Sequence, residues 1–481
     1  MSDKTDSHNS ACNISRRDFL GGCAACAAGF SALSALGISA ASAGVPADLL
    51  EPVRRQKAKV RLVFAHPSSE KPCWPNIGYD FEGHKKQVLE KLVASCPETE
   101  FLVVTAQKDD DAKEILKSDS EVDGYLLYMA GCLWGNVPEL IAASGKPTVI
   151  ADNLYAGSGK FLTGYAKARR QGHKIIAVSS SNFQDLVDAV KCLECIKKLK
   201  CSTVLVVGRN PEVEIETLYG TKVVPITFEQ FNGTHKKIDL AEAPKCAERW
   251  MREAAKVIEP SRQDVEKSAE VHLTMLELMR EHSAQAITIN CLGGFYGGHM
   301  PGYPCLGFMQ LDNDGLVGAC EGDQRSTMTK LLMTYLVGRP GFISDPVIDT
   351  AKNQIIYAHC VAPTKVFGPE GTSNPYHIRS HSEDRKGASV RSLMPLGEMT
   401  TTIEFDHRKK QVIFHQGKTV ENVDEDKACR SKLAVEVKGD VHKLLNYWDE
   451  WGWHRVTFYG DLKRPVYNIA ALLGFEVVEE A

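Results

Sequence analysis

The sequence predicts an α/β protein with two parallel-sheet α/β domains, followed by a mostly antiparallel, barrel-like β domain. From residue 59 onward, short continuous apolar runs alternate with helical stretches, as in parallel sheets covered on both faces. After residue 345 the pattern changes to strands joined by short turns, which is typical of an antiparallel domain. A chain of 481 residues is also too long for a single core, so several domains are expected.

The first α/β domain is predicted over residues 59–173 and the second over residues 174–325. In the first, strands are expected at 60–64, 101–104, 124–128 and 148–150, and helices at 84–94 and 137–143. In the second, strands are expected at 174–178, 203–207 and 286–289, and helices at 186–199, 241–255 and 262–281. Neither contains a GxGxxG or P-loop pattern, so neither predicts a nucleotide site.

A loop rich in glycine, proline and aromatic residues is expected at 290–305, directly after a buried strand. Loops in that position commonly carry binding residues. His299 in this loop is a candidate substrate contact, with a surface histidine as the alternative.

The third domain is predicted over residues 326–481. Strands are expected at 354–360, 400–405, 411–414, 433–437 and 475–478, and short helices at 441–448 and 467–473. The strands at 400–405 and 411–414 are close enough in sequence to form a hairpin.

Residues 1–43 predict a twin-arginine signal peptide. Arg16 and Arg17 precede the uncharged stretch 21–43, which is rich in alanine, glycine and serine and ends in a small-residue cleavage pattern. The alternative is a transmembrane anchor, but so many small residues make a poor one. We therefore expect export of the folded protein to the periplasm and no stable membrane anchor.

Net charge and cysteine placement exclude several classes. A formal net charge of −4 does not indicate nucleic acid or an anionic membrane as a partner. The cysteines outside the signal are scattered, and a chain with a large core does not need a disulfide framework. Cys192 and Cys195 form a CxxC pattern within a helical stretch, where a structural pair is favoured over a redox pair.

Two carboxylates flank a helix predicted at 322–337. Glu321 precedes the helix, Asp345 follows it, and glycine or proline lies beside each of them. Such carboxylates are able to bind a hard divalent cation and to transfer protons. The alternative is a charge at a helix N-terminus and an aspartate starting a turn.

Five short segments in a fixed order resemble the L-fucose/L-arabinose isomerase family, and most closely its bacterial fucose-isomerase-like branch. The segments are Cys320-Glu-Gly-Asp323, Asp345, Ala358-His-Cys360, Arg379-Ser-His-Ser-Glu383 and Gly452-Trp-His454. The resemblance covers nearly all of the chain after the signal. One departure is that Trp453 precedes His454, where family members often have two adjacent histidines.

The resemblance implies an aldose–ketose isomerase that binds a divalent metal, usually Mn²⁺, and has two α/β domains and a barrel-like domain. By position, Glu321 and Asp345 would be metal ligands and the catalytic proton-transfer pair, and His454 the third metal ligand. His359 and His381 would contact the substrate, a small-molecule sugar. The resemblance also implies a homo-oligomer, since the family's sites commonly form between subunits.

The chemistry of isomerisation accounts for these residue types. Moving a proton between adjacent carbons through an enediol requires a base such as a carboxylate. Two carboxylates and one imidazole suit manganese. The alternative function is an exported, non-catalytic carbohydrate-binding protein, because successive α/β domains also suit ligand binding by hinge closure. A third is another metal-dependent reaction on a sugar, such as epimerisation.

Overall fold

The computed structural model describes residues 47–481, so the predicted signal peptide at 1–43 lies outside the described residues. The first sheet is entirely parallel, with strand order β2-β1-β3-β4-β5. Its strands are β1 (Ala58–Ala65), β2 (Thr99–Ala106), β3 (Gly124–Met129), β4 (Thr148–Asp152) and β5 (Ile175–Val178). The domain boundaries stay predictions, although β5, just past the boundary predicted at residue 173, pairs with β4 in this sheet.

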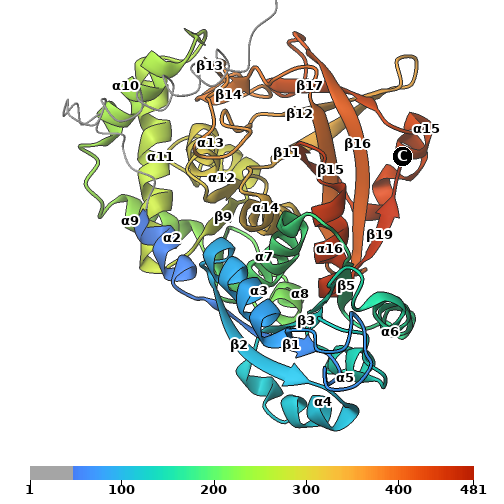
Figure 1. Ribbon diagram of the computed structural model, residues 1–481. Coiled ribbons are helices and arrows are strands. Elements are labelled where there is room, and N and C mark those ends of the chain that lie inside the picture. The colour runs from blue at the N-terminus through green and yellow to red at the C-terminus, as the bar shows by residue number, and fades with distance from the viewer. Residues whose placement is uncertain (1–46) are drawn as a thin grey trace, which may run out of the picture. The chain divides into compact units, whose positions relative to one another are not determined.

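Helices accompany the strands of this first sheet (Figure 1). They are α3 (Phe81–Ser95), α4 (Asp109–Leu116), α5 (Val137–Ala142), α6 (Ser158–Arg170) and α7 (Phe183–Lys200), with a 3₁₀ turn, η2 (Asp119–Glu121). The continuous apolar strands are buried along their length, as in β3, where every residue is buried. This is the burial pattern of a parallel sheet covered on both faces.

The second sheet is also parallel, with strand order β10-β9-β6-β7. Its strands are β6 (Thr203–Val207), β7 (Lys222–Ile226), β9 (Ala286–Ile289) and β10 (Val317–Ala319). The accompanying helices are α2 (Ala47–Arg54), α8 (Val213–Tyr219), α9 (Phe228–His235), α10 (Ala243–Glu253), α11 (Arg262–Glu281), α12 (Cys291–Tyr296) and α13 (Cys305–Asn313). The glycine-rich segment predicted as a loop at 290–305 therefore begins as a short helix, and the prediction was wrong there.

Six antiparallel strands close into a barrel in the order β15-β18-β11-β12-β17-β16, because β16 also pairs with β15. They are β11 (Phe342–Asp349), β12 (Gln354–His359), β15 (Met399–Asp406), β16 (Gln411–Asn422), β17 (Ser431–Val437) and β18 (Arg455–Tyr459). A further strand, β19 (Glu476–Glu479), pairs with β16 in parallel. The predicted fold class, two parallel α/β sheets and a mostly antiparallel barrel, is confirmed.

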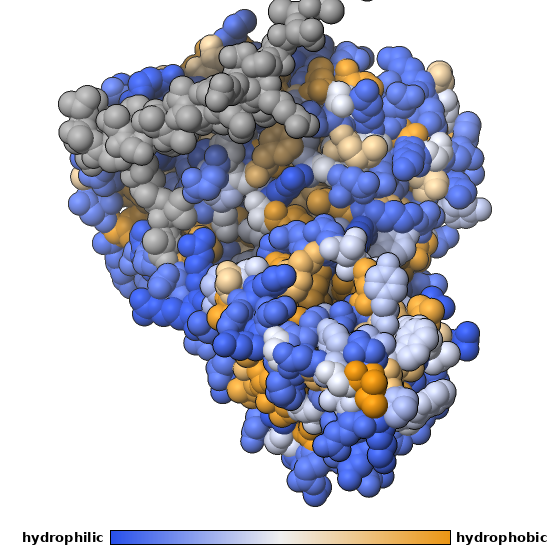
Figure 2. All heavy atoms as spheres, viewed as in Figure 1, coloured by the Kyte–Doolittle hydropathy of each residue, from blue (hydrophilic) through white to orange (hydrophobic). Residues whose placement is uncertain are grey.

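The remaining elements are small. A three-stranded sheet joins β8 (Lys256–Val257) to β13 (Tyr376–Arg379) and β14 (Ser389–Ser392). Helices α15 (Val441–Tyr447) and α16 (Lys463–Leu473), with the 3₁₀ turn η3 (Trp448–Trp451), accompany the barrel. No helix within residues 47–481 is both long and apolar enough to cross a bilayer. Figure 2 shows polar residues over most of the visible face, with hydrophobic residues in scattered patches.

Helix α14 (Gln324–Val337) joins the second sheet to the barrel, because it packs against β9 and β10 as well as β15 and β18. It is buried on nearly all sides, not along the single apolar face that the sequence pattern predicts. Its buried polar residues have partners, as a buried helix requires. The Lys330 ammonium lies 2.7 Å from a carboxylate oxygen of Asp312, and both side chains are 1% exposed.

The start of α14 differs from the sequence prediction, which placed it at residue 322. The helix begins at Gln324, and Asp323 is its N-cap, with a side chain that accepts a hydrogen bond from the Ser326 N–H at 3.0 Å. Glu321 therefore lies outside the helix and is not a first-turn charge.

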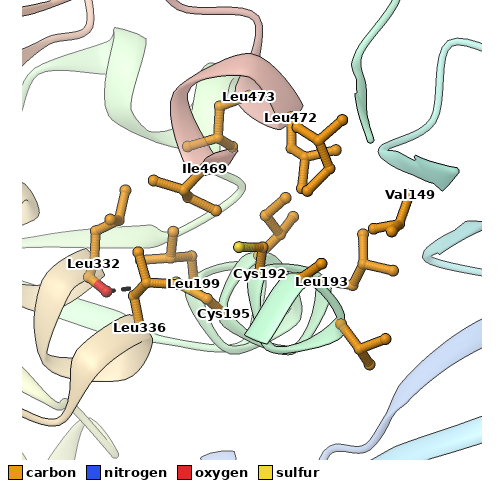
Figure 3. Close-up of a cluster of buried hydrophobic side chains, with 14 of the residues drawn as sticks. Val149, Cys192, Leu193, Cys195, Leu199, Leu332, Leu336, Ile469, Leu472 and Leu473 are labelled. Atoms are coloured by element: carbon orange, nitrogen blue, oxygen red, sulfur yellow. Dashed lines mark hydrogen bonds between the residues drawn. The ribbon is translucent and has the colours of Figure 1, made fainter. Parts of the chain in front are cut away.

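The CxxC cysteines lie inside a hydrophobic cluster formed by α7, α14 and α16 (Figure 3). Cys192 and Cys195 are both free thiols, and each is 1% exposed. The Cys195 thiol donates to the carbonyl oxygen of Leu332 at 3.4 Å. Both cysteines therefore act as small buried packing residues in this structure.

Candidate active site

Glu321 occupies a strained turn at the carboxyl end of β10. Its φ is +62° and that of Gly322 is +63°, so two successive residues are left-handed. A left-handed glutamate is uncommon, and such strain clusters at functional sites. The turn is held by the Glu321 N–H, 3.4 Å from Cys291 Sγ, and by the Gly322 N–H, which donates to the Ile289 carbonyl at 2.8 Å. A larger residue at position 322 would be strained by the positive φ, and its Cβ would lie 2.6 Å from Cδ of Arg209, which would have to move.

Three neighbouring barrel strands bring the other site residues to Glu321. Asp345 lies on β11, His359 ends β12 and His454 immediately precedes β18. Because β18, β11 and β12 are adjacent in the barrel, residues far apart in sequence meet at one edge. The site therefore forms where the carboxyl edge of the second parallel sheet faces the barrel, which agrees with the rule that ligands bind at this edge.

His454 is the most constrained residue of the site, with a side chain 4% exposed. Its Nδ1 lies 2.7 Å from Oδ2 of Asp323, so Nδ1 carries a proton and donates it to the carboxylate. Its Nε2 lies 3.5 Å from Oε2 of Glu321 and 3.3 Å from Oδ1 of Asp345. That nitrogen is buried and has no hydrogen-bond partner.

The fully buried Arg455 holds the turn that carries His454 in place. Its guanidinium pairs with the Glu480 carboxylate at 3.1 Å and donates to the backbone carbonyls of Trp448 and His454, each at 3.0 Å. A buried guanidinium with its donors satisfied is a rigid support. The position of His454 is therefore set by the barrel and not by a free loop.

Asp345 is held by Trp453, whose indole N–H donates to Oδ1 at 2.5 Å. The Trp453 side chain is itself 71% exposed. The other carboxylate oxygen, Oδ2, lies 3.8 Å from the thiol of Cys429. Trp453, the residue that departs from the family pattern, thus orients one of the two predicted carboxylates.

His359 also faces Glu321, but its Nδ1 accepts a hydrogen bond whereas that of His454 donates one. The Cys360 backbone N–H donates to His359 Nδ1 at 2.9 Å, so in the neutral ring the proton lies on Nε2. That nitrogen is 3.6 Å from Oε1 of Glu321. The Nε2 of His359 therefore lies between the Cys320 thiol, at 3.4 Å, and the Glu321 carboxylate, whereas Nε2 of His454 lies between two carboxylates.

His381 lies against aromatic residues and not beside Glu321. Its ring packs edge-to-face on Phe295 at a centroid distance of 5.0 Å, and Nδ1 is 3.4 Å from Asp384. The exposed His299 stacks on Phe228 at 5.5 Å. The structure thus brings Glu321, Asp345, His359 and His454 together, and places His381 and His299 outside this group.

Opposing effects set the pKa values of the group. Burial alone would raise the pKa of Asp345, but the nearby imidazole of His454, the charge of His359 and the indole N–H of Trp453 lower that pKa to about 2. Burial alone would lower the pKa of His454, but the hydrogen bond to Asp323 and the neighbouring carboxylates of Asp345 and Glu321 raise it well above 6.5. Without a cation, both ring nitrogens of His454 therefore carry a proton, and a metal ion that binds Nε2 would displace the proton there.

This arrangement fits a divalent cation. Among the described residues, ligand atoms of Glu321, His359 and His454 lie within 4.8 Å of one another, close enough to hold a metal ion. The orphaned Nε2 of His454 is the strongest sign, because a metal-binding imidazole commonly donates its other N–H to a carboxylate, as His454 does to Asp323. Carboxylate oxygens supply the hard donors that such a cation prefers.

Sequence reasoning missed the roles of Asp323 and Arg209. Asp323 lies within a motif that the sequence singled out, and an aspartate near the start of a helical stretch is a recognisable N-cap. Its contact with His454, 131 residues away, could not be read from that pattern. Arg209 follows a predicted strand, but no local signal pointed to Gly322.

No family model matches the chain. Over part of its length it is similar to proteins named sulfoquinovose isomerase. It is 26% identical to that of Clostridium sp. (strain MSTE9) over 218 residues, which is 42% of this chain and 45% of the relative. It is 23% identical to those of Priestia aryabhattai and Priestia megaterium over 259 residues, which is 50% of this chain and 57% of each relative. The chain thus spans about half the length of the curated relatives it matches.

Proposed function

We propose that this protein is an aldose–ketose isomerase that acts on a sugar and uses a divalent metal ion. The observation that carries the proposal is the unpartnered Nε2 of His454, directed between the carboxylates of Glu321 and Asp345. The relatives named sulfoquinovose isomerase support the reaction class, since their name denotes sugar isomerisation.

In this proposal Glu321, Asp345 and His454 hold the metal ion, and Asp323 fixes the tautomer of His454. We assign His359 to Glu321 and not to the metal. Its Nδ1 accepts the Cys360 N–H, which leaves the ring proton of the neutral imidazole on Nε2, the nitrogen that faces the site. Two carboxylates and one imidazole favour Mn²⁺ among the common divalent ions. When bound, such an ion orients the sugar oxygens and polarises the carbonyl.

The two carboxylates are also the proposed proton-transfer pair. Their side chains remain 27% and 25% exposed, so a ligand entering the site could reach both. One takes the proton from a sugar carbon and the pair returns it to the neighbouring carbon, by way of the enediol. His359, with Nε2 3.6 Å from Oε1 of Glu321, is proposed to position that carboxylate. His381 is proposed to shape the wall of the site through Phe295.

The experiment is metal analysis of the purified protein together with an isomerisation assay. Protein reloaded with Mn²⁺ after chelator treatment should contain stoichiometric metal and interconvert an aldose and its ketose. A panel of pentoses, hexoses, deoxy sugars and sulfoquinovose identifies the substrate. Sugar binding without isomerisation, in protein that holds no metal, would favour the alternative of a non-catalytic carbohydrate-binding protein.

We also propose export to the periplasm by the twin-arginine route, on the basis of Arg16 and Arg17 before the uncharged run. Replacing both arginines with lysine should retain the protein in the cytoplasm, and unchanged periplasmic recovery would refute the assignment. A homo-oligomer is part of the same proposal and is checked by light scattering of the purified protein.

A further inference from the structure

The loop after β6 lies beside the carboxylate site and is fastened to it. Gln324, the first residue of α14, accepts a hydrogen bond from the Glu212 N–H at 2.7 Å and donates to the Asn210 carbonyl at 2.8 Å. Gln324 is only 4% exposed, so these bonds are shielded from water. Residues 208–212 therefore hold a fixed position next to the turn that carries Glu321.

Arg209 is the residue of this loop that reaches the turn. Its side chain covers Gly322, since a Cβ at position 322 would lie 2.6 Å from Cδ and 2.9 Å from Nε of Arg209. Gly322 directly follows Glu321, and their Cα atoms are about 3.8 Å apart. The arginine side chain therefore lies beside the residue next to Glu321. The Cδ–Nε part of the Arg209 side chain therefore lies at the rim of the site.

The Arg209 guanidinium is unusual among the described arginines near the site, because within residues 47–481 no carboxylate lies within ion-pair distance of it. Arg325 pairs with Asp406 at 2.9 Å, Arg408 with Glu212 at 3.1 Å and Arg455 with Glu480 at 3.1 Å. Arg209 is exposed and carries its charge without compensation. A free guanidinium of this kind is well suited to a planar or tetrahedral oxyanion.

The loop backbone offers further donors. Two of its carbonyls are used internally, since Gly208 accepts from the Asn290 amide at 3.4 Å and Asn210 accepts from Gln324. Within the described part of the chain, the backbone N–H groups of Arg209 and Asn210 donate to no protein acceptor. Two free backbone donors beside one unpaired guanidinium present a positive potential at the carboxyl edge of the sheet.

We infer that the sugar handled by this site carries a terminal oxyanion, and that Arg209 with the free N–H groups of its loop binds that group. The inference rests on the proposed function, and it adds the substrate class. Before a metal ion binds, the site carboxylates repel an anionic sugar, and a cation at the rim offsets part of that repulsion. Sulfonate, carboxylate and phosphate share the required chemistry.

The test compares sugars that differ only in charge, using the full protein with added Mn²⁺ and, separately, after metal removal. Sulfoquinovose is paired with 6-deoxy-D-glucose, which lacks the sulfonate, and binding is measured by isothermal titration calorimetry. D-glucuronate and D-glucose 6-phosphate distinguish carboxylate and phosphate from sulfonate as the preferred group. The parent should bind at least one anionic sugar more tightly than the neutral one, and the preference should weaken as salt is raised.

Arg209→Met keeps the stem over Gly322 and removes the charge. Its affinity for the preferred anionic sugar should fall about tenfold to a hundredfold, the scale of losing hydrogen bonds to a charged group, while affinity for the neutral sugar is unchanged. The affinity of Arg209→Lys for the anionic sugar should lie between those of the parent and Arg209→Met. Lysine keeps the positive charge but lacks the planar guanidinium that can donate two hydrogen bonds to one oxyanion. The matched control is Arg408→Met, which removes a nearby guanidinium that Glu212 already neutralises. Circular dichroism verifies that each variant is folded.

The outcomes separate this inference from the proposed function. Parental affinity of Arg209→Met for the anionic sugar, or equal parental affinity for charged and neutral sugars, overturns the inference. Isomerisation of neutral sugars alone overturns it and leaves the proposed function standing. Binding of an anionic sugar that depends on Arg209, without isomerisation of any sugar, supports the inference and removes the proposed function.

Discussion

The two parallel sheets of this chain have the same kind of carboxyl edge but different contents. At the edge of the first sheet, a cavity of about 620 Å³ is lined by Pro67, Pro72, Cys73, Trp74, Cys132, Trp134 and Ser158. The one carboxylate that ends a strand there, Asp152, is engaged by the Ser158 N–H at 3.2 Å. At the edge of the second sheet, Glu321 and Asp323 face Asp345 and His454 from the barrel.

The difference shows what a parallel sheet does and does not supply. Both sheets place loops at one edge, but only the second edge is met by another layer whose strands bring an imidazole and a further carboxylate. Within residues 47–481, a cluster of potential metal ligands occurs at this second edge alone. The site is therefore a product of contact between sheet and barrel, and changes on either side should break it.

The largest effect is expected from Glu321→Gln. The amide keeps the size of the side chain but removes the negative charge and the base. Turnover on the protein's own sugar should fall roughly a hundredfold or more, the scale of losing a general base, and metal content should fall with it. Metal content is measured by elemental analysis of gel-filtered protein, and turnover by a coupled assay.

The matched change at the other edge is Asp152→Asn, which should retain parental metal content because its carboxylate caps a loop. If Glu321→Gln keeps the parental metal content and turnover, Glu321 is only a structural charge. Metal loss in Asp152→Asn would end the distinction between the two edges.

A smaller effect is expected from Asp323→Asn. An asparagine can still cap α14, so the helix should persist. The amide no longer accepts the Nδ1 proton as a charged group, and the ring of His454 loses its fixed tautomer. Metal affinity should fall about tenfold to a hundredfold, as for other residues that orient a metal-binding histidine. Competition with a fluorescent chelator measures the affinity.

Asp440→Asn is the control for Asp323→Asn, since Asp440 caps α15 in the same way and is remote from the site. Equal metal affinity in Asp323→Asn and the parent would show that the 2.7 Å contact does not orient His454. An equal loss in Asp440→Asn would trace the effect to helix capping.

The buried acid beneath the site predicts a pH dependence. Burial, together with the charge of Asp323, raises the pKa of Glu404 from 4.5 to about 8. Between these values the folded protein holds a proton that the unfolded chain has released, so stability falls as pH rises through this window. The slope from one group is at most roughly 1.4 kcal/mol per pH unit.

Glu404→Gln mimics the protonated acid, so its free energy of unfolding should lack this contribution to the pH dependence. Relative to the parent, that free energy should increase between pH 5 and 8 by up to roughly 1.4 kcal/mol per pH unit. Urea unfolding of metal-free protein at several pH values measures the difference. Glu436→Gln, at an exposed position on β17, should track the parent throughout. Parallel pH profiles for Glu404→Gln and the parent would contradict the assigned pKa.

The sequence alone was sufficient to predict the positions of most helices and strands and the fold class, because strand and helix patterns depend on local periodicity. Helix 262–281 and strands such as 203–207 and 286–289 have the predicted bounds. Periodicity gives no information about a side chain's partner that is distant in sequence. Helix α14 has buried polar residues on several faces because Asp312, Glu404 and Asp406 reach it from other elements.

The candidate site shows the same division. The carboxylates and His454 came from ordered motifs, whereas the tautomers of His454 and His359 depend on Asp323 and on the Cys360 backbone, which only the folded chain brings into contact. Arg209 packs on Gly322 beside the left-handed turn at Glu321, and no local pattern encodes that contact.

The smallest effect is expected at the CxxC pair, which lies in the hydrophobic cluster and not at either edge. Burial raises the pKa of Cys192 to about 12 and raises that of Cys195 as well, so almost no reactive thiolate forms near neutral pH. A mild reductant should leave activity unchanged. Cys195→Ser should also keep parental turnover, losing on the order of 1 kcal/mol of stability from a weakly satisfied hydroxyl in an apolar cluster.

Cys201→Ser is the control for the cysteine change, because Cys201 ends the same helix and is only partly buried. Activity is compared with and without reductant in the parent and both variants, and stability by urea unfolding. A reductant effect that Cys195→Ser abolishes and Cys201→Ser retains would make the pair a redox element. The hydrophobic cluster would then be a second functional region, and the comparison of the two sheet edges would no longer account for all the chemistry of the chain.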